Sequence, residues 1–160
     1  MMPTCRAWAA AAFAGVLAAG IGAAAFAADE PANIVKYRQA LMRANGAHVT
    51  MFSAMVKDEV SWNDELARHA RALHEQSQNL LRLFPEGTAK GEVEVDTRAL
   101  PAIWERWDEF QQAAQAFEQE SAKLVEAAEN GDQMGIAQQL AALGKQGCGN
   151  CHETFREERN

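Results

Sequence analysis

The feature that most constrains the fold is a regular ladder of apolar residues over positions 101–130. Successive members are four and three residues apart, which places them on one face of an α-helix in the seam pattern of packed helices. The members are Ile103, Trp107, Phe110, Ala114, Phe117, Ser121, Leu124 and Ala128. A helix with such a face cannot bury it alone, so this segment requires partner helices.

Three further segments have helical periodicity, and none of the chain shows the alternation typical of a β-strand. We expect helices over 31–56, 61–84, 101–130 and 132–158, with 85–100 as a long connection. Four amphipathic helices of this kind predict an all-α fold, an antiparallel up-down-up-down four-helix bundle. The first helix carries two neighbouring apolar stripes, Met42/Val49/Val56 and Leu41/His48/Met55.

The helix starts have recognisable signals. Ser61-Trp-Asn-Asp64 resembles a capping box, Pro101 is a natural first-turn proline, and Asp132 is a good N-cap residue. We therefore place the starts of the second, third and fourth helices at these residues.

Residues 1–28 have the pattern of a secretory signal peptide. Arg6 precedes an Ala-rich apolar stretch at 7–25, and small residues follow at 25–28. The stretch is also long enough for a membrane anchor, but the Ala-x-Ala site and the acidic residues after it favour cleavage behind Ala28. We expect residues 29–160 to form a single exported domain in the periplasm, with no membrane association once the signal is removed.

The run Cys148-Gly-Asn-Cys151-His152 carries the chemistry of this chain. Cys-x-x-Cys-His is the attachment signature of c-type haem. On a helix the two thiols and the imidazole project from one face, so they can meet a single flat ring. We expect one covalent haem c with His152 as an iron ligand, and Gly147 and Gly149 to let the ring lie close to the backbone.

Two other interpretations of the paired cysteines are weaker. A thioredoxin-like dithiol would need a preceding strand and a βαβ setting. A structural zinc site would need two more ligands at suitable spacing, whereas His48, His69 and His74 are scattered over two helices. Neither requirement is met.

Several segments together resemble the class II c-type cytochromes, the family of the cytochromes c prime and their low-spin, methionine-ligated relatives. The segments are Lys36-Tyr-Arg-Gln-Ala-Leu-Met42, Leu83-Phe-Pro-Glu-Gly87, Pro101-Ala-Ile-Trp104 and Cys148-Gly-Asn-Cys-His-Glu-Thr-Phe-Arg156. The resemblance implies a periplasmic four-helix bundle that is often a homodimer. It also implies that Arg38 and Gln39 lie near the haem propionates and Arg156 beside the proximal histidine, although the residues alone favour solvated surface charges for both arginines.

Helix order locates the expected haem pocket. His152 lies about six residues before the end of its helix, or about 9 Å at 1.5 Å per residue. The residues at the same level of an antiparallel bundle are 38–42, 80–84 and 103–107, with the 85–100 connection folded over them. Met42 is level with the iron, whereas His48 lies about 9 Å deeper. Phe84, Trp104, Trp107 and Phe155 are expected to be pocket walls.

Two functions fit these residues. In the favoured one, the protein is an electron carrier whose iron is held by His152 and Met42, because a thioether ligand raises the potential of a six-coordinate iron. In the alternative, the iron is five-coordinate and the protein binds NO or CO. An enzyme is not expected, because the level-matched residues include no polar acid–base group opposite His152.

The charge of the chain limits its partners. The net charge is −7, and loss of Arg6 with the signal makes it about −8. Such an acidic chain does not suit nucleic acid or anionic lipid. We expect redox partner proteins with basic surfaces, and a second copy of the chain if one apolar stripe of the first helix forms a subunit contact.

Overall fold

The computed structural model describes residues 30–131 and 133–158, and the predicted signal segment and Asp132 lie outside these ranges. Its elements in chain order are α1 (Pro31–Val56), η1 (Asn63–Glu65), α2 (Leu66–Ser77), η2 (Leu80–Leu83), α3 (Ala102–Glu105), α4 (Trp107–Asn130), α5 (Gln133–Ala142), η3 (Leu143–Gly149) and α6 (Asn150–Phe155). Within the described residues there is no strand, only one isolated bridge between Ala99 and Arg156.

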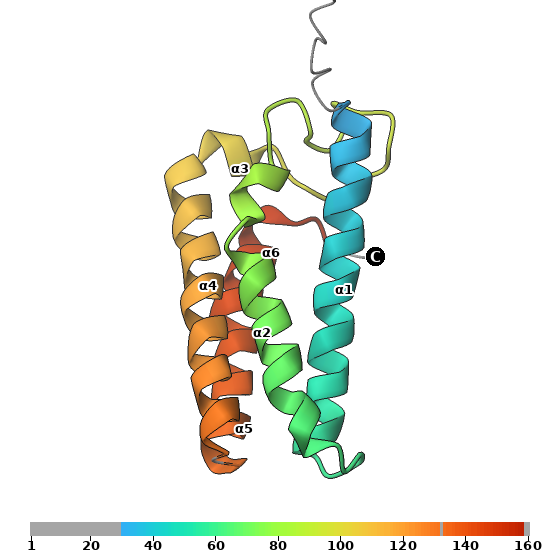
Figure 1. Cartoon of the computed structure of the whole chain (residues 1–160). Coiled ribbons are helices and arrows are strands. Elements are labelled where there is room, and N and C mark those ends of the chain that lie inside the picture. The colour runs from blue at the N-terminus through green and yellow to red at the C-terminus, as the bar shows by residue number, and fades with distance from the viewer. Residues whose placement is uncertain (1–29, 132, 159–160) are drawn as a thin grey trace, which may run out of the picture.

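The long helices pack side by side as an antiparallel four-helix bundle, as the apolar ladder predicted (Figure 1). The main contacts join α2 to α4, α4 to η3, α1 to α2 and α4 to α5. In α4, Phe110, Ala114, Phe117 and Leu124 are buried in one core cluster together with residues of every other column. The ladder therefore forms the central seam of the bundle.

The second predicted helix is broken into three pieces. Residues 63–65 and 80–83 form short turns of tighter pitch around α2. The expected capping box is absent. Trp62 precedes η1 and Glu65 precedes α2, and neither helix start has a hydrogen bond from a capping side chain. The break after α2 falls at Asn79, whose φ of −111° and ψ of 11° leave the helical region, and Asn favours turns over helix interiors.

The third and fourth predicted helices are also interrupted. Arg106, with φ −127° and ψ 48°, separates α3 from α4, and Pro101 stands just before α3 rather than within its first turn. The last column changes to wider π-helical turns over Leu143–Gly149 and ends at Phe155, three residues earlier than predicted. Arg156 is extended, which lets it pair with Ala99 in the connection that follows η2.

The core-facing row of α1 coincides with the predicted stripes only in part, at Met55. Its fully buried members include Val35 and Phe52, and two polar residues, Arg38 and Asn45, occupy buried positions in the same row. Because these two residues are polar, a search for apolar periodicity in the sequence does not detect the row. Members of the Met42/Val49/Val56 stripe are partly buried and pack at the edge of the core.

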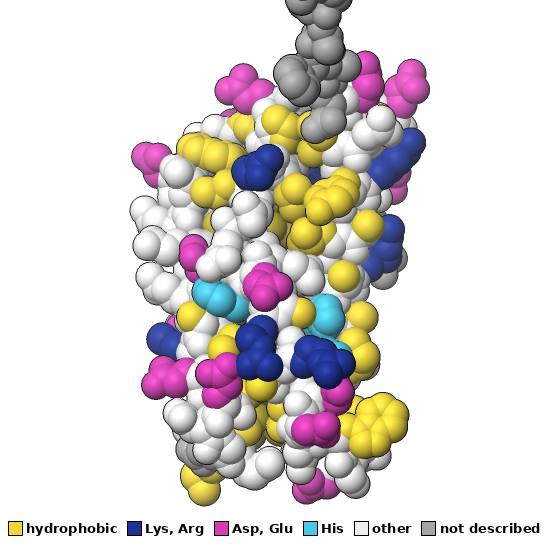
Figure 2. Space-filling view, viewed as in Figure 1, with side chains coloured by type: hydrophobic (Ala, Val, Ile, Leu, Met, Phe, Trp, Pro, Cys, Tyr) yellow, Lys and Arg dark blue, Asp and Glu magenta, His cyan; other side chains and the backbone are white. Residues whose placement is uncertain are grey.

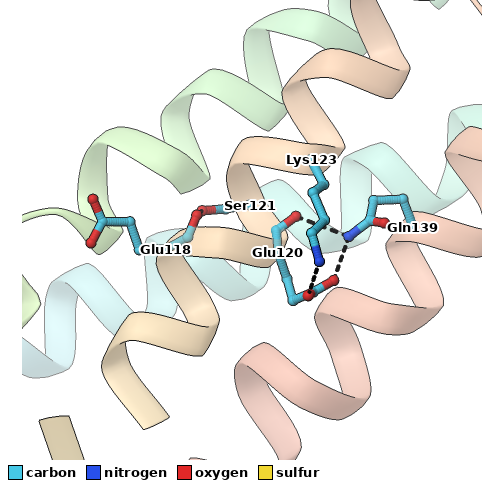
Figure 3. Close-up of polar contacts among 5 residues, drawn as sticks. All are labelled: Glu118, Glu120, Ser121, Lys123 and Gln139. Atoms are coloured by element: carbon cyan, nitrogen blue, oxygen red, sulfur yellow. Dashed lines mark hydrogen bonds and ion pairs between the residues drawn. The ribbon is translucent and has the colours of Figure 1, made fainter. Parts of the chain in front are cut away.

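A buried carboxylate links α4 to α5 (Figure 3). Gln139 Nε2 donates to Oε2 of Glu120 at 2.6 Å and to its backbone oxygen at 3.1 Å, and Lys123 Nζ donates to Oε1 at 2.7 Å. Glu118, two residues earlier, points to the other side of α4. The Glu120 carboxylate therefore has partners for both oxygens although it is buried, which meets the usual requirement for a charge away from water.

None of the helices within residues 30–131 and 133–158 combines the length and the apolar character needed to cross a membrane.

Candidate haem site

A cavity of about 790 Å³ lies between the start of α1, the connection after η2, the first turns of α4, and α6. Its volume is within the usual range for cofactor and ligand sites. The lining comprises Arg38, Gln39, Met42, Arg43, Leu80, Phe84, Val95, Asp96, Thr97, Arg98, Ala99, Ile103, Phe110, Cys151, His152, Phe155 and Arg156. It thus brings together segments that are up to about a hundred residues apart in the chain.

The attachment motif lies at the junction of η3 and α6. Cys151 and His152, in α6, are half-buried and line the cavity, whereas Cys148, in η3, is half-buried and packs against the core cluster beside it. The two thiols are not joined in a disulfide. The three motif residues therefore do not share one regular helical face, because wider turns replace the α-helix immediately before Asn150.

Gly147 has a packing role that the sequence did not predict. A Cβ atom built there would lie 3.2 Å from Cα of Phe117 and 3.0 Å from Cδ1 of Leu143. The glycine therefore allows η3 to approach the backbone of α4. A Cβ at Gly149 would come 3.3 Å from the carbonyl oxygen of Gly144, inside the same column. Both contacts are with the protein itself rather than with the cavity.

Burial sets the protonation of the motif side chains. Burial, and next the positive charges of Arg156 and Arg98, lower the pKa of His152 to about 4. The imidazole is therefore neutral at neutral pH, which is the form that binds a metal ion. Burial likewise raises the pKa of Cys151 to about 11, with the neighbouring Cys148 adding to the effect and Arg156 opposing it.

Arg38 is neither a solvated surface charge nor free to move. Its side chain is 3% exposed, and Nη1 donates to Leu83 O and Thr88 Oγ1, both at 3.1 Å. Nη2 donates to Thr88 O at 2.9 Å and to Thr97 Oγ1 at 3.1 Å. Burial lowers the pKa of Arg38 to about 10, so the guanidinium is charged at neutral pH and holds the connection after η2 against α1.

The other predicted polar residues lie on the same wall. Gln39 Nε2 donates to the backbone oxygen of Asp96 at 2.6 Å, which fixes a second point of the same connection to α1. Arg156 is exposed and lines the cavity close enough to His152 to lower its pKa. Arg43 and Arg98 also line the cavity, so its rim is cationic and suits the carboxylates of a haem.

The apolar part of the lining surrounds Met42. This side chain is half-buried and shares the cavity wall with Leu80, Phe84 and Phe155. Trp104 and Trp107 are not part of the lining. The Trp104 indole donates to the carbonyl oxygen of Phe84 at 3.1 Å, and the Trp107 ring packs on Phe110 with centroids 5.5 Å apart. Both tryptophans therefore support the wall from behind.

The segment 95–99 is the largest part of the cavity lining that could not be identified from the sequence. Its place depends on backbone pairing with the end of the chain: Leu100 N donates to Phe155 O at 3.0 Å and Glu157 N donates to Arg98 O at 2.9 Å. The sequence predicted that the connection would cover this end of the bundle. No local signal in it marks Arg98 as a neighbour of His152, because that contact arises from pairing across 59 residues.

These residues fit a covalently attached haem. The cavity has apolar walls for a flat ring, a cationic rim for its carboxylates, and a neutral imidazole on its surface. Cys151 lies on the same wall and Cys148 beside it. The haem itself supplies an iron centre that can change oxidation state or bind a small diatomic gas.

Comparison with known proteins agrees with this fit. Residues 33–156 match the family model described as Cytochrome C'. The chain is 39% identical over 127 residues to "Cytochrome c'" of Pararhodospirillum photometricum, covering 79% of this chain and 98% of the relative. It is 35% identical to "Cytochrome c-554" of Cereibacter sphaeroides, covering 78% and 93%.

Solved structures show the same fold. Cytochrome c' from Rubrivivax gelatinosus superposes with a TM-score of 0.72 at 26% identity, covering 81% of this chain and 98% of that one. A nitric oxide complex of a mutant cytochrome c prime from Alcaligenes xylosoxidans gives a TM-score of 0.71 at 27% identity, covering 81% and 98%.

The fold and the site define a c-type haem protein built on a four-helix bundle. This chain belongs to the cytochrome c' family, whose members carry one covalently bound haem c.

Proposed function

We propose that this chain is a gas-binding haem protein with a five-coordinate iron. In this proposal Cys148 and Cys151 attach the haem and His152 is the protein's only iron ligand. The apolar wall around Met42 then borders the space left for NO or CO. The observation that carries the proposal is the structural match to a mutant cytochrome c prime solved as a nitric oxide complex, together with the apolar part of the cavity lining.

This proposal replaces the sequence-based preference for ligation by Met42. None of the comparisons supports that ligation. A half-buried thioether that lines the cavity together with Leu80 and Phe84 also fits the role of an apolar wall.

The decisive experiment is the absorption and EPR spectrum of the purified holoprotein. We expect a high-spin ferric iron and a ferrous form that binds CO and NO without displacing a protein ligand. A six-coordinate low-spin iron that takes up CO only slowly would contradict the proposal.

Electron transfer by a His152/Met42-ligated iron is the second candidate. Its specific support is that Met42 and His152 both line the cavity. A low-spin spectrum in both oxidation states would favour this candidate.

We also propose a periplasmic location, with export by the segment 1–28. Neither nucleic acid nor a membrane surface is a proposed partner, given the net charge of −7. Redox partner proteins remain proposed partners for reduction of the iron. No catalytic activity is proposed, because the cavity lining within the described residues offers no second histidine as an acid–base group.

A homodimer is the proposed assembly. A groove of about 590 Å³ between α1 and η2 is lined by Ile34, Tyr37, Leu41 and Leu83, together with polar residues at its edges. Tyr37 is 62% exposed, and Figure 2 shows apolar side chains gathered over the upper part of α1 and the segment after α2. The residues that α1 contributes to this groove do not belong to its buried, core-facing row. They therefore offer a surface for a second copy of the chain.

A further inference from the structure

Two histidines face each other across the contact between α1 and α2, outside the haem cavity. Nδ1 of His48 lies 2.9 Å from Nδ1 of His69, and the two rings are tilted by 52° with centroids 5.2 Å apart. Both side chains are half-buried, and Figure 2 shows histidine side chains reaching the surface where α1 and α2 meet. Both histidine side chains are therefore partly accessible to solvent.

The proton count of this pair leaves room for a cation. A neutral imidazole carries one N–H, so only one of the two facing Nδ1 atoms can donate and the other must accept. The facing nitrogens therefore share a single proton. A metal ion that displaces this proton to water would find a nitrogen lone pair on each ring.

The separation of the nitrogens discriminates between metals. Imidazole nitrogens bind first-row metals at about 2.0–2.1 Å. Two such ligands at a right angle are about 2.9 Å apart, whereas tetrahedral ligands are about 3.3 Å apart. The observed hydrogen-bond separation of 2.9 Å would need almost no change for the right-angled arrangement, which is typical of tetragonal copper(II) and nickel(II) sites.

We propose that His48 and His69 bind one copper(II) ion through their facing Nδ1 atoms. Within the described residues no group of three or more His, Cys, Asp or Glu side chains is placed to hold a metal. The site is therefore a two-histidine site, and water completes the coordination on the exposed side. Copper ranks first in affinity among the divalent first-row metals for nitrogen ligands.

Such an ion would join α1 to α2. Because it binds the folded pair and not the separated helices, it would raise the stability of the protein with increasing copper concentration. Met42 lies six residues before His48, or about 9 Å along α1, so the copper would be separate from the haem cavity.

The test uses the tag-free ferric holoprotein titrated with copper(II) by calorimetry, with EPR of the bound copper. We expect one tight site per chain, and an EPR spectrum with hyperfine splitting from two nitrogens. The variants His48→Asn and His69→Asn should each weaken binding by about tenfold or more, since loss of outer-shell partners alone costs about 10–100-fold.

His74→Asn is the matched control. His74 is also a half-buried histidine of α2, but its hydrogen bonds go to Ser121 and Gln78 rather than to another histidine. Its removal should leave copper binding unchanged. Equal loss in all three variants, or a wild-type EPR spectrum with fewer than two nitrogens, would overturn the proposal.

A second measurement keeps the test independent of variant folding. Copper(II) should raise the thermal midpoint of the wild-type holoprotein, nickel(II) should raise it less, and neither should raise that of the doubly substituted variant. A midpoint that does not respond to copper(II) in the wild-type protein would also overturn the proposal.

Discussion

The guanidinium of Arg38 donates to both the hydroxyl and the carbonyl oxygen of Thr88, at 3.1 and 2.9 Å. This fork joins α1 to the connection after η2, fifty residues away in the chain. The same guanidinium lies 4.5 Å from the ring centroid of Phe84, which lines the cavity. One buried cation therefore holds both the wall of the cavity and the segment that closes it.

Arg38→Met should lower the free energy of unfolding by about 2–4 kcal/mol, because it leaves buried oxygens of Leu83 and Thr88 without a donor. Arg38→Lys keeps the charge but not the planar fork, so it should recover only part of the loss. Urea unfolding of the holoprotein measures both values. Full stability of the lysine variant would show that charge, rather than forked hydrogen bonding, is what the site requires.

Met42→Ala should leave the iron high-spin and speed up CO binding, because the change only enlarges the apolar part of the cavity. Stopped-flow CO mixing and EPR of the two proteins provide the measurement. Met42→Leu is the control that preserves the volume of the side chain. A low-spin wild-type iron that becomes high-spin in both variants would instead identify Met42 as the sixth ligand.

Glu120→Gln should reduce stability at pH 7 by about 1–2 kcal/mol through loss of charge-assisted hydrogen bonds. Hydrogen bonding from Lys123, and next from Gln139, lowers the pKa of Glu120 below its ordinary 4.5. Because the folded pKa is the lower one, the stabilisation is fully present above pH 4.5 and is lost as the pH falls through the folded pKa. The difference between wild type and variant should therefore narrow in acid.

The matched control for that pH profile is Glu118→Gln on the same helix. Its carboxylate points away from Gln139 in Figure 3. Urea unfolding at pH 7 and at pH 3 should show little change for this variant. An equal, pH-dependent loss in both variants would assign the effect to general charge rather than to the α4–α5 link.

Tyr37→Asp should convert the dimer to a monomer, because it places a charge in the apolar groove between α1 and η2. Sedimentation velocity at micromolar concentration measures the change. Trp62→Asp is a control, since Trp62 is 67% exposed but does not line the groove. A wild-type protein that sediments only as a monomer would refute the dimer.

The exported protein should begin at Asp29 and carry one haem that survives acid–acetone extraction. Intact-mass spectrometry of the periplasmic fraction tests both points at once. Cys151→Ala should leave at most one thioether bond, through Cys148. An extractable haem in the wild-type protein would refute covalent attachment.

The long-range arrangement of helices could be predicted because the apolar ladder of α4 is uninterrupted from Phe110 to Leu124. The interruptions could not. Each break is a single residue, Asn79 or Arg106, whose φ and ψ lie outside the helical region. A break of one residue leaves the spacing of the apolar residues almost unchanged, so the sequence pattern does not reveal it. The π-helical turns before Asn150 likewise leave the apolar spacing of the last column nearly unchanged.

The position of the cavity along the bundle could be predicted from the sequence, but several of its lining residues could not. Counting residues along antiparallel helices places Met42 near His152, because rise per residue is constant in a helix. It cannot place Arg98, whose position depends on a connection without regular structure. The burial of Arg38 was also hidden, since an arginine between Tyr37 and Gln39 gives no sign that four oxygens of η2 and the connection after it will surround it.

The pairing of Arg98 and Leu100 with the chain end bears on the order in which the molecule folds. Helices form through contacts four residues apart, whereas this pairing spans 59 residues and must first overcome the entropy of closing a long loop. We therefore expect such contacts to form after the helices, so that the segment 95–99 completes the cavity wall last. Until then we expect Cys151 and His152, which line the cavity, to stay accessible to solvent.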